Sequence, residues 1–109
     1  MRPQMPKIIS AYLKASNDRD GEAFGTLFTE DAVVHDEGKE HRGVAAIQRW
    51  LASTAKKYAF TLKPINVSQK ANETILAVKM TGDFPGSPLS VSFCFVIHEG
   101  KIERLEIRS

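Results

Sequence analysis

Cysteine is almost missing from this sequence, and long apolar runs are missing altogether. The single cysteine, Cys94, cannot form an internal disulfide, and one thiolate is too few for a structural zinc site. This favours a reducing, cytoplasmic setting. No stretch approaches the ~20 apolar residues of a membrane-spanning helix, and residues 1–7 lack the apolar core of an export signal. We therefore expect neither a membrane partner nor export.

Charge of one sign is not concentrated either. The chain carries 15 Lys and Arg against 13 Asp and Glu, a formal net charge of +2. Proteins that bind nucleic acid gather basic side chains on one face, so we expect no nucleic-acid partner. The one local bias is acidic, because five acids and a single base lie between positions 30 and 40. These acids are Glu30, Asp31, Asp36, Glu37 and Glu40.

What the sequence does contain is the material for one folded domain. It has 109 residues, of which 42% are hydrophobic and 26% charged, as in an ordinary globular protein. We expect a single domain over residues 1–109. The hydrophobic pattern changes once, near residue 58, from a helical period to alternation.

Three helices are predicted before residue 58. The first begins near Pro3 or Pro6 and ends at Asn17 and Asp18, and its apolar stripe comprises Met5, Ile8, Ile9, Tyr12, Leu13 and Ser16. Asp20 is placed to cap a short second helix, whose apolar face is Ala23, Phe24, Leu27 and Phe28. The third helix opens at Gly43.

Strands are predicted at 32–36 and over most of the chain after Tyr58. The first is followed by a turn at Glu37-Gly38-Lys39, and residues 89–98 alternate with one strongly apolar face. Pro64 lies where the alternation slips, which indicates a bulge or an edge. Glu99-Gly100-Lys101 forms a tight turn into the last strand. The fold class is therefore α+β, with three helices on one face of a curved antiparallel sheet.

Such a sheet covered by helices leaves a cone-shaped cavity, and two polar side chains are predicted to reach it. Tyr12 lies on the buried stripe of the first helix, and a buried phenol normally needs a hydrogen-bond partner. Asp36 shares a strand face with Ala32 and Val34, so its carboxylate is expected at the cavity rim. A carboxylate that loses hydration there becomes a better base, and a neutral phenol opposite it can donate to a developing oxyanion.

Around this pair the sequence resembles a known family. The order of Tyr12, Asn17, Asp20, Leu27-Phe28, Asp31-Ala32 and Asp36, followed by Gly43-Val44-Ala45-Ala46-Ile47, is similar to that of the bacterial ketosteroid isomerases over residues 12–47. More broadly it resembles the nuclear transport factor 2-like superfamily and its SnoaL-like branch. That branch includes polyketide cyclases, dehydratases and ligand-binding proteins that are not enzymes.

The resemblance assigns roles to these residues. It implies that Asp36 is the base that moves a proton and that Tyr12 is the oxyanion donor, in a reaction without a cofactor. Phe93 stands where the isomerases carry a second donor, a protonated Asp, and Glu37 stands where they carry Pro. We expect an apolar or aromatic small-molecule ligand, contacted by Trp50, Phe93 and Phe28.

Other interpretations remain open at this point. The same cavity could hold an apolar ligand without transforming it, and the domain could instead serve association through the outer face of its sheet. A homodimer through the sheet is expected by resemblance and because long strands with two partly apolar faces need covering. His35, Asp36 and His41 include metal-ligand types, but strand alternation separates His35 from Asp36, so no metal site is predicted.

Overall fold

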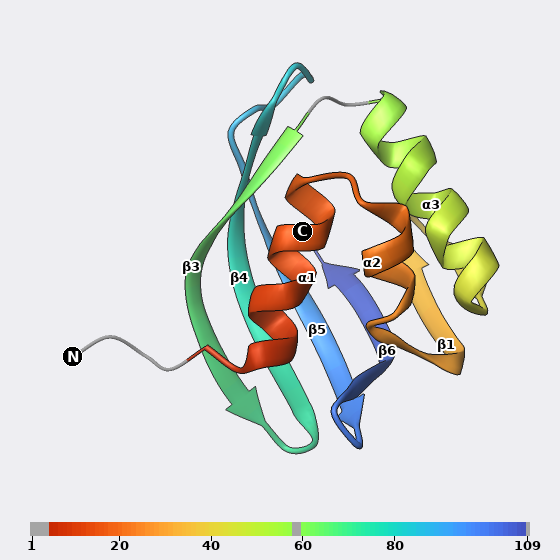
Figure 1. Cartoon of the computed structure of the whole chain (residues 1–109). Helices are drawn as coiled ribbons and strands as arrows, with labels where there is room; N and C mark the ends of the chain where they lie inside the picture. The colour runs from red at the N-terminus through yellow and green to blue at the C-terminus, as the bar shows by residue number, and fades with distance from the viewer. Residues whose placement is uncertain (1–4, 58–59, 109) are drawn as a thin grey trace.

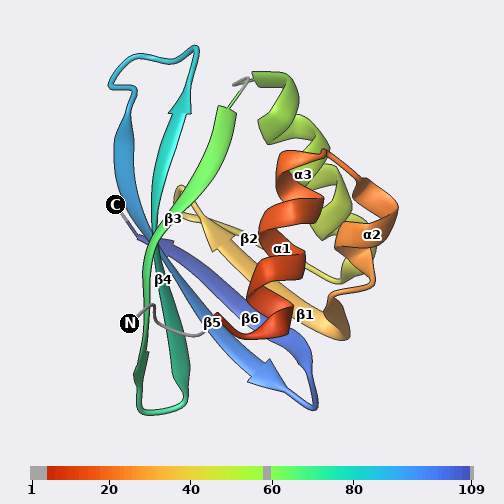
Figure 2. The same cartoon turned by 60° about the vertical axis from the view of Figure 1, so that its left-hand side comes forward.

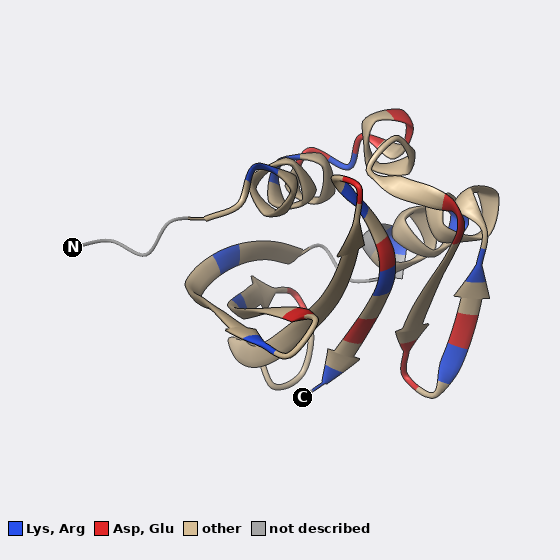
Figure 3. Cartoon of the chain, turned by 90° about the horizontal axis from the view of Figure 1, so that it is seen from below, with Lys and Arg blue, Asp and Glu red and all other residues tan. Residues whose placement is uncertain are grey.

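The computed structural model of the chain describes residues 5–57 and 60–108. Three helices lie on one face of a strongly curved six-stranded sheet (Figure 1). In the described part of the chain no helix is long and apolar enough to cross a membrane. Acidic and basic residues are interleaved along the strands and helices (Figure 3).

The helices begin and end close to the predicted positions. Helix α1 (Lys7–Asn17) follows Pro6, and α2 (Gly21–Gly25) is capped by the Asp20 carboxylate, which accepts a 3.1 Å hydrogen bond from the Ala23 amide. Helix α3 (Val44–Lys57) begins after Gly43. Leu27 and Phe28 were predicted on the second helix, but Leu27 lies in the turn that follows it and Phe28 begins a strand. The prediction was wrong because α2 ends one turn earlier, at Gly25.

The sheet has the order β2-β1-β6-β5-β4-β3. Its strands are β1 (Phe28–Asp36), β2 (Lys39–Arg42), β3 (Phe60–Lys70), β4 (Glu73–Gly82), β5 (Leu89–His98) and β6 (Lys101–Arg108). Strands β3 to β6 form an antiparallel meander, and the register slips between Pro64 and Asn66 as expected.

Two features of the sheet differ from the prediction. Strand β1 pairs in parallel with β6, so the sheet is not wholly antiparallel. Lys39, predicted in a turn, begins the short strand β2. The prediction was wrong because the neighbours of Lys39 are polar and carry no alternation that would mark a strand. Only Glu37 and Gly38 form the turn between β1 and β2, both with positive φ (53° and 73°), as a tight two-residue hairpin requires.

The core lies between the helices and the concave face of the sheet (Figure 2). Its fully buried side chains come from every layer, among them Ile9 of α1, Ile47 of α3, Leu76 of β4, Phe95 of β5 and Leu105 of β6. Alternation at the end of β1 places Val34 in this core at 0% exposure and turns its neighbours His35 and Val33 outward.

Candidate functional site

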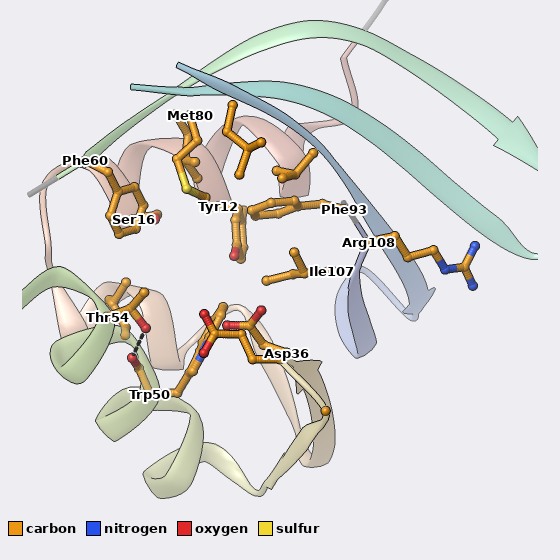
Figure 4. Close-up of a pocket in the computed structure, with 16 residues that line it drawn as sticks. Tyr12, Ser16, Asp36, Trp50, Thr54, Phe60, Met80, Phe93, Ile107 and Arg108 are labelled. Atoms are coloured by element: carbon orange, nitrogen blue, oxygen red, sulfur yellow. Dashed lines mark hydrogen bonds between the residues drawn. The ribbon is translucent and has the colours of Figure 1, made fainter. Parts of the chain in front are cut away.

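A cavity of about 460 Å³ opens between the helices and the sheet (Figure 4). This volume is within the range of ~300–1,000 Å³ typical of small-molecule sites. Most of its wall is apolar, including Leu51, Phe60, Leu62, Met80, Val91 and Phe93. The polar groups are few and come mainly from α1, α3 and the end of β1.

Asp36 reaches this cavity because of where β1 ends. Ala32 and Val34 of the same strand face are fully buried, and Asp36 continues that face one step beyond the core, where it is half-buried. The tight turn at Glu37-Gly38 ends the strand at this point. The indole Nε1 of Trp50 donates a 3.0 Å hydrogen bond to the Asp36 Oδ2 atom. This bond leaves the other carboxylate oxygen without a partner among the described residues.

Tyr12 projects from α1 into the same cavity, and its ring is 1% exposed. The ring packs at 5.1 Å centroid distance against both Phe24 and Phe95. Within the described ranges no group hydrogen-bonds to the Tyr12 hydroxyl. Burial, and then the negative charge of Asp36, raise the pKa of Tyr12 well above its ordinary value. The phenol is therefore neutral and can donate a proton in a hydrogen bond.

The other predicted ligand contacts are divided between cavity and core. Trp50 and Phe93 line the cavity together with Tyr12 and Asp36. Phe28 does not line it. Its side chain is 2% exposed and packs beneath, against Phe24 at 5.1 Å and Tyr12 at 6.5 Å between ring centroids. Phe28 is the first residue of β1, and its ring is part of the core on which the Tyr12 ring packs.

Three polar residues at the cavity were not predicted as site residues. Ser16 lies on the predicted stripe of the first helix, and Thr54 lies four residues after Trp50, so helical spacing could have placed both hydroxyls at the cavity wall. Arg108 lines the rim, but its guanidinium is 3.0 Å from a Glu106 oxygen and 3.9 Å from a Glu73 oxygen. Figure 4 shows it pointing away from the cavity.

The histidines near Asp36 do not join it in a metal site. The His35 ring lies on the opposite strand face, 3.7 Å from a Glu40 oxygen, and the His41 ring lies 6.1 Å from the Trp50 ring. Across residues 5–57 and 60–108 there is no group of three or more His, Cys, Asp or Glu that could hold a metal ion.

Comparison with known proteins identifies the family. A profile of the SnoaL-like domain matches residues 9–105. The chain belongs to the SnoaL-like domain family. No curated protein matches the chain.

Solved structures of the same fold include two proteins named as candidate polyketide cyclases. A candidate polyketide cyclase from Sinorhizobium meliloti is 36% identical, with a TM-score of 0.91 and 95% of each chain covered. A second candidate polyketide cyclase, from Pseudomonas putida, is 26% identical, with a TM-score of 0.80 over 97% of this chain and 92% of the other. A protein from Catenulispora acidiphila with a ketosteroid isomerase-like fold, in complex with trimethylamine, shares the fold at 18% identity and a TM-score of 0.85, over 97% of this chain and 87% of that one.

Proposed function

We propose that this SnoaL-like protein catalyses proton transfer at the carbon next to a carbonyl group, with Asp36 as the base and Tyr12 as the oxyanion donor. One observation carries the proposal. The unpartnered phenol of Tyr12 and the carboxylate of Asp36 open into the same apolar cavity, close enough for the Asp36 charge to act on the phenol. A neutral donor and an ionisable base around one volume are the two parts that enolisation needs.

The chemistry follows from the geometry. The free oxygen of Asp36 would take the α-proton, and the electron pair of the broken C–H bond would form the enolate carbon–carbon double bond. The negative charge that develops on the carbonyl oxygen would be stabilised by the hydroxyl of Tyr12. In a β,γ-unsaturated ketone the enolate is conjugated, and return of the proton from Asp36 to the γ-carbon gives the isomer with the double bond moved. Attack of the enolate carbon on a second carbonyl instead closes a ring, and the alkoxide that forms takes the proton from Asp36. Trp50 holds the other Asp36 oxygen during these steps.

The apolar wall and the name of one relative support the same kind of substrate. Aromatic and aliphatic side chains around the cavity suit a ring-bearing, mostly apolar molecule. The name of the Sinorhizobium meliloti relative, 36% identical, refers to polyketides, which carry many carbonyl groups. A carbonyl compound with an acidic α-hydrogen therefore fits both the site and the family.

The proposal can be tested with 2-tetralone, a small ketone with acidic α-hydrogens. Exchange of these hydrogens in D₂O is followed by NMR, with and without the protein. We expect Asp36→Asn to lower the protein-catalysed rate by about 100-fold or more, the usual effect of losing a positioned base. Asp31→Asn, which removes an exposed carboxylate from the same strand, serves as the matched control and should keep the rate. Equal exchange by wild type and Asp36→Asn would disprove the role of Asp36.

One observation favours a second function, a binding protein without catalysis. Phe93, 2% exposed, places an edge-on ring 5.8 Å from that of Tyr12, where the isomerase resemblance implies a second oxyanion donor. A cavity with one donor binds a ketone but stabilises an enolate less. If the wild-type protein bound 2-tetralone but did not raise the exchange rate of its α-hydrogens above the rate in buffer, the result would support binding without catalysis over the proposed reaction.

We also propose that the protein forms a homodimer through its sheet and works in the reducing cytoplasm. Ile75 and Val96 lie on the outer face of the sheet and are only half-buried, so a second copy would cover apolar surface there. Light scattering after size-exclusion chromatography tests the dimer, and a monomer at micromolar concentration would refute it. Cys94 is a free, buried thiol, as a reducing compartment permits.

A further inference from the structure

Ser16 is a polar side chain whose position in the cavity the proposed reaction does not use. The residue lies in the last turn of α1, is 5% exposed and lines the cavity. Its hydroxyl has no hydrogen-bond partner among the described residues. Every fully buried side-chain nitrogen or oxygen in the described part of the chain has a hydrogen-bond partner, so the unpaired Ser16 hydroxyl is not fully buried and opens into the cavity.

Thr54 shows that such a hydroxyl can be satisfied by the helix itself. Its Oγ1 donates to the Trp50 carbonyl one turn earlier in α3, as serine and threonine often do. Ser16 has the Tyr12 carbonyl at the same spacing and does not bond to it. Serine is also a poorer helix former than alanine. Alanine at this position would therefore stabilise the helix more than a serine whose hydroxyl is unpaired.

Ser16 and Asp36 lie at opposite walls of the cavity. Asp36 ends β1, which is the second strand of the sheet, whereas β3 is the strand at the other edge. The side-chain amide of Asn17 bonds to both backbone groups of Leu62 in β3, at 2.8 and 3.0 Å, and so fixes the neighbouring Ser16 beside that strand. Figure 4 shows Ser16 on the Phe60 side of the cavity and Asp36 on the other side.

We infer that the cavity takes an elongated, mostly apolar ligand with a hydrogen-bonding oxygen at each end, one held at Tyr12 and Asp36 and the other by Ser16. The inference rests on the proposed function for the first of these positions. The apolar side chains between them, such as Leu51, Phe60 and Phe93, suit the ring framework that joins the two oxygens. Ser16 thus determines specificity and does not take part in proton transfer.

The test measures binding, so it does not depend on catalysis. Calorimetric titration compares each diol with its mono-hydroxy analogue. The 2,6- and 2,7-dihydroxynaphthalenes are compared with 2-naphthol, and the longer 4,4′-dihydroxybiphenyl is compared with 4-phenylphenol. In the wild type we expect at least one diol to bind about 2- to 10-fold more tightly than its mono-hydroxy analogue, the effect of one added hydrogen bond. Ser16→Ala should abolish this preference and leave binding of the mono-hydroxy compound unchanged.

Ser10→Ala, on the exposed face of the same helix, is the matched control and should keep the preference. Thermal unfolding of each variant shows that it is folded, which is expected because alanine favours a helix. The inference is wrong if no diol is preferred by the wild type, or if the preference survives in Ser16→Ala. Equal α-exchange by the wild type and Asp36→Asn, with a diol preference that Ser16→Ala abolishes, would disprove the proposed reaction alone, so the two failures are distinguishable.

Discussion

The indole of Trp50 and the carboxylate of Asp36 join a helix to the end of a strand. The 3.0 Å bond between Nε1 and Oδ2 connects α3 to the last residue of β1, at a cavity wall where both residues are partly shielded from water. A hydrogen bond to an ionised group is stronger than one between neutral groups. The same contact therefore holds the proposed base in place and contributes to stability.

This contact predicts a measurable coupling between the two residues. Trp50→Phe removes the donor and keeps an aromatic ring, and Asp36→Ala removes the acceptor. In a double-mutant cycle we expect the free energies of unfolding to be non-additive by about 1–3 kcal/mol. Denaturant unfolding of the wild type, both single variants and the double variant measures this non-additivity. The pair Trp50→Phe and Asp31→Ala should be additive, and additivity for the Asp36 pair as well would show that the bond contributes nothing.

Much of the fold could be predicted from the sequence because its patterns are local. The apolar stripe of α1, the Asp20 cap and the alternation of residues 89–98 each depend on neighbours within a turn or a strand. The parallel pairing of β1 with β6 could not, because it depends on how distant segments meet. Strand β2 lies beside β1 across a two-residue turn, but its polar residues carry no alternation that marks a strand.

The site could be predicted only where one element determined the direction of a side chain. Tyr12 and Asp36 follow from helical spacing and strand alternation, and both line the cavity. The bond from Trp50 to Asp36 depends on the placement of α3 over β1, which no local pattern encodes. Ser16 was on the predicted stripe, but its free hydroxyl is visible only when the groups around it are known.

The turn that ends β1 gives a second prediction. Gly38 has a φ of 73°, and there is open space where a Cβ would lie, so strain of the backbone is the only cost of a side chain there. Gly38→Ala should lower the free energy of unfolding by about 1–2 kcal/mol. Gly21→Ala is the control, because Gly21 also has open space but lacks a positive φ, and it begins a helix. Denaturant unfolding measures both, and equal stability of the two variants would contradict the argument.

The buried phenol of Tyr12 predicts how stability changes at high pH. Its pKa in the folded protein is raised by burial and by the charge of Asp36, whereas in the unfolded chain it has the ordinary value near 10. Below pH ~10 the phenol is neutral in both states and the full stability is present. As the pH rises further, the unfolded chain loses this proton and the folded protein keeps it, so unfolding becomes more favourable.

The expected slope is about 1.4 kcal/mol per pH unit for this single group, up to its pKa in the folded state. Lysines and other groups also titrate in this range, so the quantity to measure is the difference between wild type and Tyr12→Phe. Urea unfolding at pH 9, 10 and 11 should show the wild type losing stability faster than Tyr12→Phe. At pH 7 the two should differ little, because the hydroxyl has no hydrogen-bond partner among the described residues. Parallel curves from pH 9 to 11 would mean that the Tyr12 phenol ionises as readily in the folded protein as in the unfolded chain, which would contradict its burial beside the charge of Asp36.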